Sequence, residues 1–282
     1  MKNKLIVLIK FNKTDKDSPK YKGMRFKKTL ARKEWWDNRL QIMKDIVMPS
    51  LRSQTYQDFD IVAPFSTDID TKLCSPMMEF LIENGAYVCW DDRKLKDFVE
   101  PVEFFRDFYY NKVDNLVVLN HDSDDIYHPE AFSELMNRDI EEGTVFIFRN
   151  GYVYDRQTRR LAHYEGMSSP PPFYAMTFAN RALKNQKAWD KFCDEYNLKL
   201  EHPHLDYAKR TAELSDGKFL YLFHTHNVTS SWDNPHHVKH IVHLVTGERK
   251  KDVLESEFRI LYGLHPITAL LSPADRGQVS LG

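Results

Sequence analysis

Short apolar runs alternate with amphipathic segments through the first half of the chain. The apolar runs have the length of strands, whereas the segments between them carry apolar residues at helical spacing. The predicted strands are residues 5–11, 60–65, 86–90 and 116–119. The predicted helices are 40–49, 73–83 and a segment around 104–109. Because strands and helices alternate, we expect a parallel, doubly wound α/β half.

The second half mixes shorter β-rich runs with helices. The predicted strands there are 144–148, 151–154 and 219–223, and the predicted helices are 129–139, 187–196 and 204–212. Residues 235–271 carry only helical patterns. The fold class that follows is α/β, with a mixed, mostly parallel central sheet, flanking helices and a helical C-terminal extension.

Composition and charge narrow the function classes. Hydrophobic residues make up 42% of the 282 residues and charged residues 29%, as in a globular protein. Lys and Arg (40) nearly balance Asp and Glu (41), so the net charge of -1 gives no general attraction to nucleic acid or anionic membranes. The chain has no GxxxxGK[ST] loop and no GxGxxG, which removes the main signals of P-loop hydrolysis and dinucleotide oxidoreduction.

Cysteine usage and hydropathy indicate the compartment. Cys74, Cys89 and Cys193 are scattered without CxxC spacing, which favours a reducing compartment. The apolar run 5–9 is too short for a signal peptide or a membrane span, and no other run approaches spanning length. We therefore expect a cytoplasmic protein with no transmembrane segment.

Acidic residues follow the strand 116–119 at once. Asp122, Asp124 and Asp125 fall within four positions, where ligands bind in open α/β sheets. Asp122 and Asp124 alternate, so an extended backbone would point both the same way. Carboxylates this close repel unless a cation neutralises them, and oxygen ligands suit a hard divalent ion. The alternative is a solvated acidic turn that caps the next helix.

Two histidines supply a further candidate ligand. His224 and His226 follow the strand 219–223 and are two positions apart, hence on one face. Two aspartates and one imidazole, completed by water and phosphate oxygens, suit Mn²⁺ or Mg²⁺. A structural hydrogen-bonding role is the alternative for either histidine. A divalent ion beside a β-α-β half is what nucleotide-diphosphate chemistry needs, because it neutralises the leaving diphosphate.

Seven stretches in order resemble a GT-A nucleotide-sugar glycosyltransferase of the family-2 type, and most nearly the putative rhamnosyltransferase family. They are residues 9–12, 36–40, 48–55, 58–62, 120–125, 149–155 and 222–229. The resemblance implies a catalytic domain over residues 1–232, made of a nucleotide-binding half (1–125) and an acceptor half (126–232). The helical extension would then be residues 233–282.

The resemblance also implies roles for individual residues. Asp122 and Asp124 would hold the metal and the donor diphosphate, with Asp125 close behind and His224 as a further ligand; His226 is an addition to the pattern. The nucleotide pocket would lie at the ends of the first three strands, with Arg39 and Arg106 as candidates to contact phosphate. The pocket residues would be Phe11, Asn12, Asp15, Ser66, Asp68, Asp91 and Asp92.

An inverting transfer also needs a base on the acceptor hydroxyl. The stretch 201–210 is comparable to the family's base-bearing motif, and Asp206 or His204 is the candidate, with Glu201 third. The expected partners are a nucleotide sugar and an acceptor glycan or lipid-linked sugar, and a modified DNA base stays open. Two other functions stay open as well: a nucleotidyltransferase, and a non-catalytic carbohydrate-binding protein with the same fold.

Overall fold

The computed structural model describes residues 2–11, 32–66, 70–91, 102–155, 160–164, 173–198 and 208–223 of the chain. The predicted helical extension, 233–282, lies outside these residues. Within them, no helix is long and apolar enough to cross a membrane.

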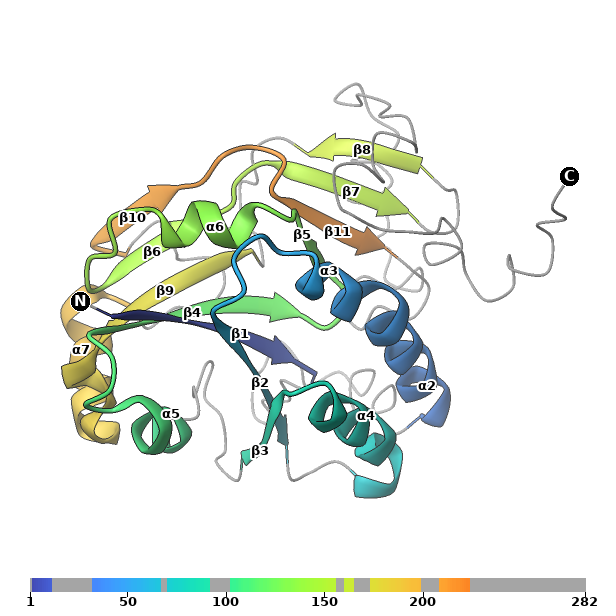
Figure 1. The fold of residues 1–282 in the computed structure, drawn as a ribbon, viewed down its shortest axis with the longest axis horizontal. Coiled ribbons are helices and arrows are strands. Elements are labelled where there is room, and N and C mark those ends of the chain that lie inside the picture. The colour runs from blue at the N-terminus through green and yellow to red at the C-terminus, as the bar shows by residue number, and fades with distance from the viewer. Residues whose placement is uncertain are drawn as a thin grey trace, which may run out of the picture.

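A seven-stranded sheet organises the described part of the chain, in the order β10-β6-β9-β4-β1-β2-β3 (Figure 1). β9 runs antiparallel to its neighbours β4 and β6, and the remaining pairs are parallel. The strands are β1 (Asn3–Lys10), β2 (Phe59–Ser66), β3 (Tyr87–Asp91), β4 (Asn115–Asp122), β6 (Thr144–Ile147), β9 (Tyr174–Ala179) and β10 (Arg210–Glu213). The predicted mixed, mostly parallel sheet is therefore confirmed.

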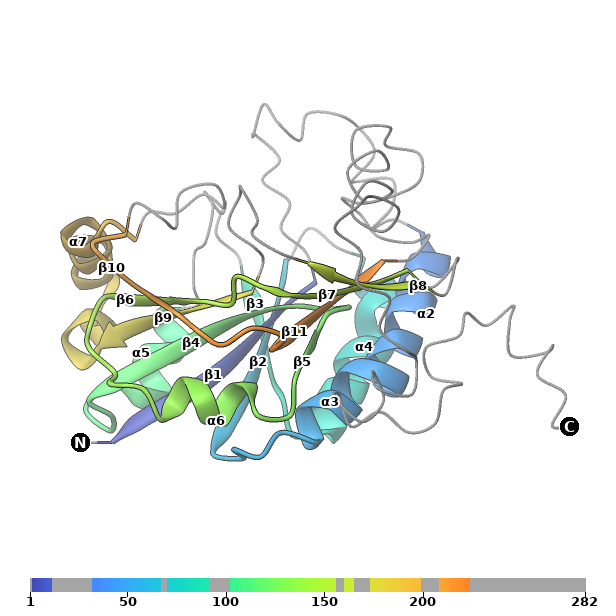
Figure 2. The same ribbon diagram turned by 90° about the horizontal axis from the view of Figure 1, so that it is seen from above.

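Helices cover both faces of this sheet, because its central strands are apolar on both sides. Leu5, Val7 and Ile9 of β1 share one core with α2 (Lys33–Ile42), α3 (Met48–Arg52) and α4 (Thr71–Glu83). Ile6 and Leu8 face the opposite core, with α5 (Val102–Tyr109) and α7 (Gln186–Tyr196). Figures 1 and 2 show α2 beside α4, away from α5 and α7. A π-helical turn, η2 (Met43–Val47), joins α2 to α3.

A second, four-stranded sheet has the order β5-β11-β7-β8. Its strands are β5 (Ile126–Tyr127), β11 (Phe219–Phe223), β7 (Gly151–Asp155) and β8 (Arg160–Tyr164). Tyr127, Val153 and Leu222 belong to the same core as α2, so the two sheets share one interior. β11 pairs with β5 and β7, and it thereby brings the second half of the chain to the segment that follows β4.

Several predicted elements differ from the observed ones. β5, β8 and β9 were not among the predicted strands. β5 has only two residues and β8 is a short run of mixed polarity, so neither carries a clear local strand pattern. The helix predicted for 204–212 is wrong at residues 210–212, which form part of β10. β10 is largely exposed and is held by its backbone pairing with β6 and by the Arg210–Glu141 ion pair (2.9 Å), so tertiary contacts override a weak local pattern.

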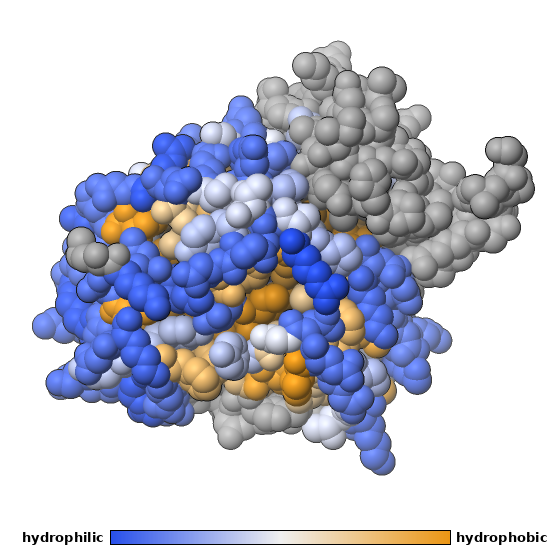
Figure 3. Space-filling view, in the orientation of Figure 1, coloured by the Kyte–Doolittle hydropathy of each residue, from blue (hydrophilic) through white to orange (hydrophobic). Residues whose placement is uncertain are grey.

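Apolar side chains reach the surface around the β3 edge of the sheet. Ile82 at the end of α4, Tyr87 in β3 and Phe108 in α5 are exposed. Figure 3 shows apolar residues at the surface, among polar ones, on the face seen in Figure 1.

Candidate active site

The order of the strands creates a switch point between β1 and β4. From β1 the chain moves outward to β2 and β3, and then returns to place β4 on the other side of β1. Ligands of open α/β sheets bind at the carboxyl ends of strands at such a point. Lys10 and Asp122 are the last residues paired in the β1–β4 ladder, so Asp122 lies directly beside the end of β1.

The acidic turn, residues 122–125, begins where β4 ends. Asp122 is the last strand residue and is half-buried, and the amide of Asp125 donates to its carbonyl at 3.2 Å. Ser123 and Asp124 therefore lie in a turn rather than in extended backbone. Strand alternation therefore does not relate Asp122 to Asp124, because the strand ends at Asp122 and the turn begins there.

Arg39 of α2 forms a buried ion pair with Asp124. The Nη1 of Arg39 lies 2.5 Å from the Oδ2 of Asp124, and the two side chains are only 4% and 12% exposed. The guanidinium also stacks over the ring of Trp35, one helical turn earlier, at 5.0 Å. A buried charge is costly unless it has a partner of opposite sign, so the pair fixes the acidic turn against α2.

Asp125 connects the acidic turn to the second sheet. Its side chain is buried, and its Oδ1 accepts a hydrogen bond from the amide of Leu222 in β11 at 3.3 Å. Its Oδ2 is buried and has no hydrogen-bond partner among the described residues. Burial raises the pKa of Asp125, and the nearby charges of Asp124 and Asp122 raise it further. Leu222 precedes the predicted histidine ligand, His224, by two positions in the sequence.

His121 supports the same turn from inside the sheet. Its Nδ1 lies 2.6 Å from the carbonyl oxygen of Asp122, and its ring packs 5.4 Å from that of Tyr127. The Tyr127 hydroxyl donates to the carbonyl of Asn120 at 2.7 Å. Complete burial lowers the pKa of His121 to about 4, so the ring is neutral at pH 7 and Nδ1 is assigned as the protonated nitrogen.

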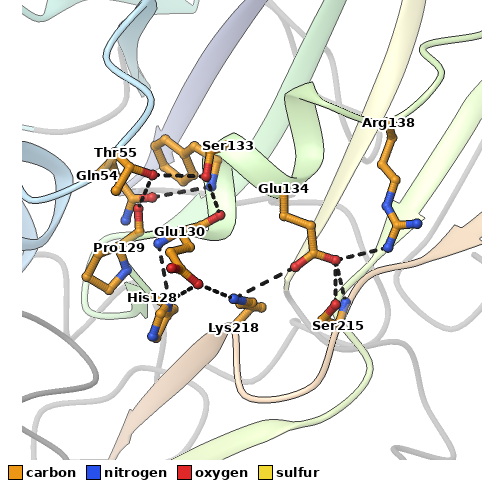
Figure 4. A network of polar contacts seen from close by, with 11 residues as sticks. Gln54, Thr55, His128, Pro129, Glu130, Ser133, Glu134, Arg138, Ser215 and Lys218 are labelled. Atoms are coloured by element: carbon orange, nitrogen blue, oxygen red, sulfur yellow. Dashed lines mark hydrogen bonds and ion pairs between the residues drawn. The ribbon is translucent and has the colours of Figure 1, made fainter.

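A polar network holds the segment just after the acidic turn (Figure 4). Lys218, just before β11, contacts Glu130 at 2.9 Å. Glu134 of α6 (Ala131–Met136) accepts a hydrogen bond from the amide of Ser215 at 2.8 Å. These contacts bind β5 and α6 to the loop before β11. The acidic turn is therefore fixed on both sides, which is what a binding site on a rigid scaffold requires.

The predicted nucleotide-pocket residues divide into two groups. Phe11 lies at the end of β1, as expected, but its ring is buried and stacks on Phe65 at 5.0 Å and near Trp36 at 6.4 Å. This aromatic cluster forms part of the core beneath the switch point. Ser66 and Asp91 are the last residues of β2 and β3, at the same edge of the sheet as Asp122.

Arg39 and Arg106, both predicted to contact phosphate, lie on opposite faces of the sheet. Arg106 is in α5, and its Nε donates to Asp107 at 2.8 Å on the surface. The structure therefore brings Arg39, and not Arg106, into contact with the acidic turn. The remaining predicted site residues lie outside the described part of the chain: Asn12, Asp15, Asp68, Asp92, Glu201, His204, Asp206, His224 and His226.

The oxygen atoms of the acidic turn are of the type that binds a hard divalent cation, but the described residues supply too few of them for a complete site. Carboxylate oxygens are the ligands that Mg²⁺ and Mn²⁺ prefer, and the buried Oδ2 of Asp125 has acceptor capacity left. Within the described ranges, however, no group of three His, Cys, Asp or Glu is arranged to hold a metal ion. Arg39 already neutralises Asp124, so further ligands would have to come from outside these residues or from a substrate.

The Arg39–Asp124 contact was not predicted, although the helix pattern carries a signal for it. Trp35, Arg39, Ile42 and Ile46 follow one another at helical spacing, and all four are buried. An arginine within an apolar stripe indicates a buried charge and hence a carboxylate partner nearby. His121 was likewise assigned no role, because one histidine at a strand end carries no distinctive pattern.

No protein family matches the sequence, and no curated protein sequence does either. Solved structures with a similar chain path include the glycosyltransferase GlyE of Streptococcus pneumoniae, at 13% identity and a TM-score of 0.36. That match covers 99% of this chain and 64% of GlyE, so the chain spans slightly under two thirds of the relative's length.

Two further structures show the same degree of similarity. The inositol-1-phosphate CTP transferase from T. maritima has 12% identity and a TM-score of 0.36, covering 92% of this chain and 94% of that one. Mouse xyloside xylosyltransferase 1 has 12% identity and a TM-score of 0.34, covering 88% and 96%. Similarity at this level identifies neither a family nor a reaction.

Proposed function

We propose that the protein is a metal-dependent glycosyltransferase that moves a sugar from a nucleotide-diphosphate sugar to an acceptor hydroxyl. The observation that carries the proposal is the position of Asp122. It is half-buried, ends β4 at the switch point, and lies beside the end of β1. A carboxylate cluster at that point is suited to hold the diphosphate of a nucleotide through a cation.

The residues of the chain would divide the work as follows. Asp122, with Asp124 and His224, would hold Mn²⁺ or Mg²⁺, which when bound neutralises charge on the departing diphosphate. Asp125 and His121 would keep the turn in place through Leu222 and the carbonyl of Asp122.

The nucleotide and the acceptor would be bound by different parts of the chain. The residues that end β1, β2 and β3, together with Asn12, Asp68 and Asp92, would line the nucleotide pocket, since parallel strands end at one edge. Asp206 or His204 would take the proton of the acceptor hydroxyl. A rhamnosyl donor and a glycan, lipid-linked or modified-base acceptor follow from the sequence resemblance.

A thermal-shift screen of nucleotide sugars, with and without Mn²⁺, tests this proposal. We expect stabilisation by UDP- or dTDP-sugars that needs Mn²⁺ and is lost in Asp122→Ala. Asp114→Asn is the matched control, because Asp114 precedes the opposite end of the same strand. The control should respond like the wild type.

Product analysis separates the alternatives. Release of nucleoside diphosphate from a nucleotide sugar would support sugar transfer, whereas pyrophosphate released from a nucleoside triphosphate would indicate a nucleotidyltransferase. Binding of sugars without any turnover would indicate a non-catalytic protein. The absence of a response to any nucleotide diphosphate would refute the proposal.

A further inference from the structure

We propose that Arg39 is an internal cation that neutralises Asp124 until a divalent cation displaces it, so that Arg39 sets the cation affinity of the acidic turn. This rests on the proposed function, because it requires that the turn bind a divalent cation. The motivating contact is the 2.5 Å approach of the Arg39 Nη1 to the Asp124 Oδ2.

The contact has the features of a replaceable charge pair. Nη1 of Arg39 is buried and has no aligned hydrogen-bond acceptor, although it lies close to the Asp124 oxygen. At Nη1 the pair is therefore held by charge attraction at close range and not by an aligned hydrogen bond. The stack on Trp35, at 5.0 Å, gives the guanidinium a second support that does not require Asp124.

A second, independent feature points to a cation or donor inside the turn. Asp125 is only 1% exposed, and within the described ranges its Oδ2 has no hydrogen-bond partner. Buried polar atoms in folded proteins nearly always have partners, so this oxygen is an acceptor that a cation or a hydrogen-bond donor could use. Arg39 neutralises the charge of Asp124 but does not donate a hydrogen bond to the Oδ2 of Asp125.

Arg39 and a divalent cation would compete because like charges repel strongly where water is excluded. Asp122 is the most accessible acid of the turn. The charges of Asp122, Asp124 and Arg39 all act on Asp125, so an ion held at Asp122 would share its surroundings with the guanidinium that neutralises Asp124. The opposite possibility is that Arg39 merely orients Asp124 and thereby assists the ion. The two differ in sign, since removing the charge of Arg39 strengthens cation binding in the first case and weakens it in the second.

The test measures Mn²⁺ binding to the full chain by electron paramagnetic resonance of the free ion, with thermal unfolding in EDTA alongside. Arg39→Met should bind Mn²⁺ roughly tenfold or more tightly than wild type, because a nearby unit charge is removed from a partly buried site. The same variant should unfold at a lower temperature in EDTA, since Asp124 loses its close cation. A purely structural role would not move these two readouts in opposite directions.

Three further variants complete the design. Arg39→Gln removes the charge but keeps a donor for Asp124, so it should also bind more tightly, and it keeps the test valid if Arg39→Met does not fold. Arg39→Lys retains the charge and should bind like wild type. Arg52→Met is the matched control, since Arg52 ends the same helical run, is exposed, and donates through Nη2 to the side chain of Asn84.

The outcomes separate this inference from the proposed function. Unchanged or weaker Mn²⁺ binding in both Arg39→Met and Arg39→Gln would overturn the competition. Wild type and Asp122→Ala that bind Mn²⁺ equally poorly would instead refute the metal site on which the proposed function depends.

Discussion

His121 should make the stability of the protein depend on pH in a defined window. Its pKa falls from 6.5 to about 4 in the folded protein because the ring is completely buried. The unfolded chain therefore binds a proton more readily than the folded one between these values. Stability contributed by the neutral ring is fully present above pH 6.5 and is lost as the pH falls toward 4.

The size of the stability change follows from the pKa of His121 in the unfolded and folded protein. A depression from 6.5 to about 4 lowers the free energy of unfolding by about 2 kcal/mol between pH 7 and pH 5. Urea unfolding of the metal-free protein at both pH values measures it. His121→Phe keeps an aromatic ring beside Tyr127 and removes the titrating group.

Comparing wild type with His121→Phe separates the effect of His121 on pH-dependent stability from that of the other histidines. His121→Phe should be less stable than wild type at pH 7, because it lacks the donor to the Asp122 carbonyl. It should nevertheless lose about 2 kcal/mol less than wild type on acidification to pH 5. Equal losses in the two proteins would show that His121 is not buried in its neutral form.

Three further substitutions test the packing. Phe65→Ala removes a fully buried ring that stacks on Phe11 at 5.0 Å, and should cost about 3–5 kcal/mol by urea unfolding; a loss under about 1 kcal/mol would contradict the aromatic cluster. Gly151→Ala would place a Cβ 2.6 Å from the carbonyl oxygen of Phe219, so we expect a loss of about 1–3 kcal/mol, and unchanged stability would show that β7 and β11 are not so close. Arg181→Met should lower the free energy of unfolding by less than about 1 kcal/mol in a thermal scan. Arg181 pairs with two glutamates, but its side chain is 47% exposed, and exposed ion pairs contribute little; a larger loss would mean that the network is buried in an assembly.

Sequence patterns predicted the part of the fold that depends on local periodicity. The strands β1 to β4 and the helices between them follow from apolar runs and stripes, and the position of Asp122 at a strand end follows with them. The short strand β5 did not, because Ile126 and Tyr127 form a strand only by pairing with Leu220 and Phe219 of β11. Such pairing joins residues about ninety positions apart, and no local pattern records it.

The candidate site was also predictable only in part. The sequence identified the acidic turn, but the partner of each acid depends on tertiary packing. Arg39 faces Asp124 only because α2 packs on the core face of the sheet beside β4. Asp125 could not be distinguished from Asp124 by spacing, yet it contacts Leu222 of β11 instead of α2.

The most direct test of the account is anomalous diffraction at the manganese edge from crystals grown with Mn²⁺ and a nucleoside diphosphate. We expect one strong anomalous peak in contact with a carboxylate oxygen of Asp122 and next to the bound diphosphate, with Arg39 moved away from Asp124. A nucleotide bound at the ends of β1 and β4 without such a peak would contradict the metal site. A nucleotide bound elsewhere on the molecule would contradict the assignment of the switch point as the active site.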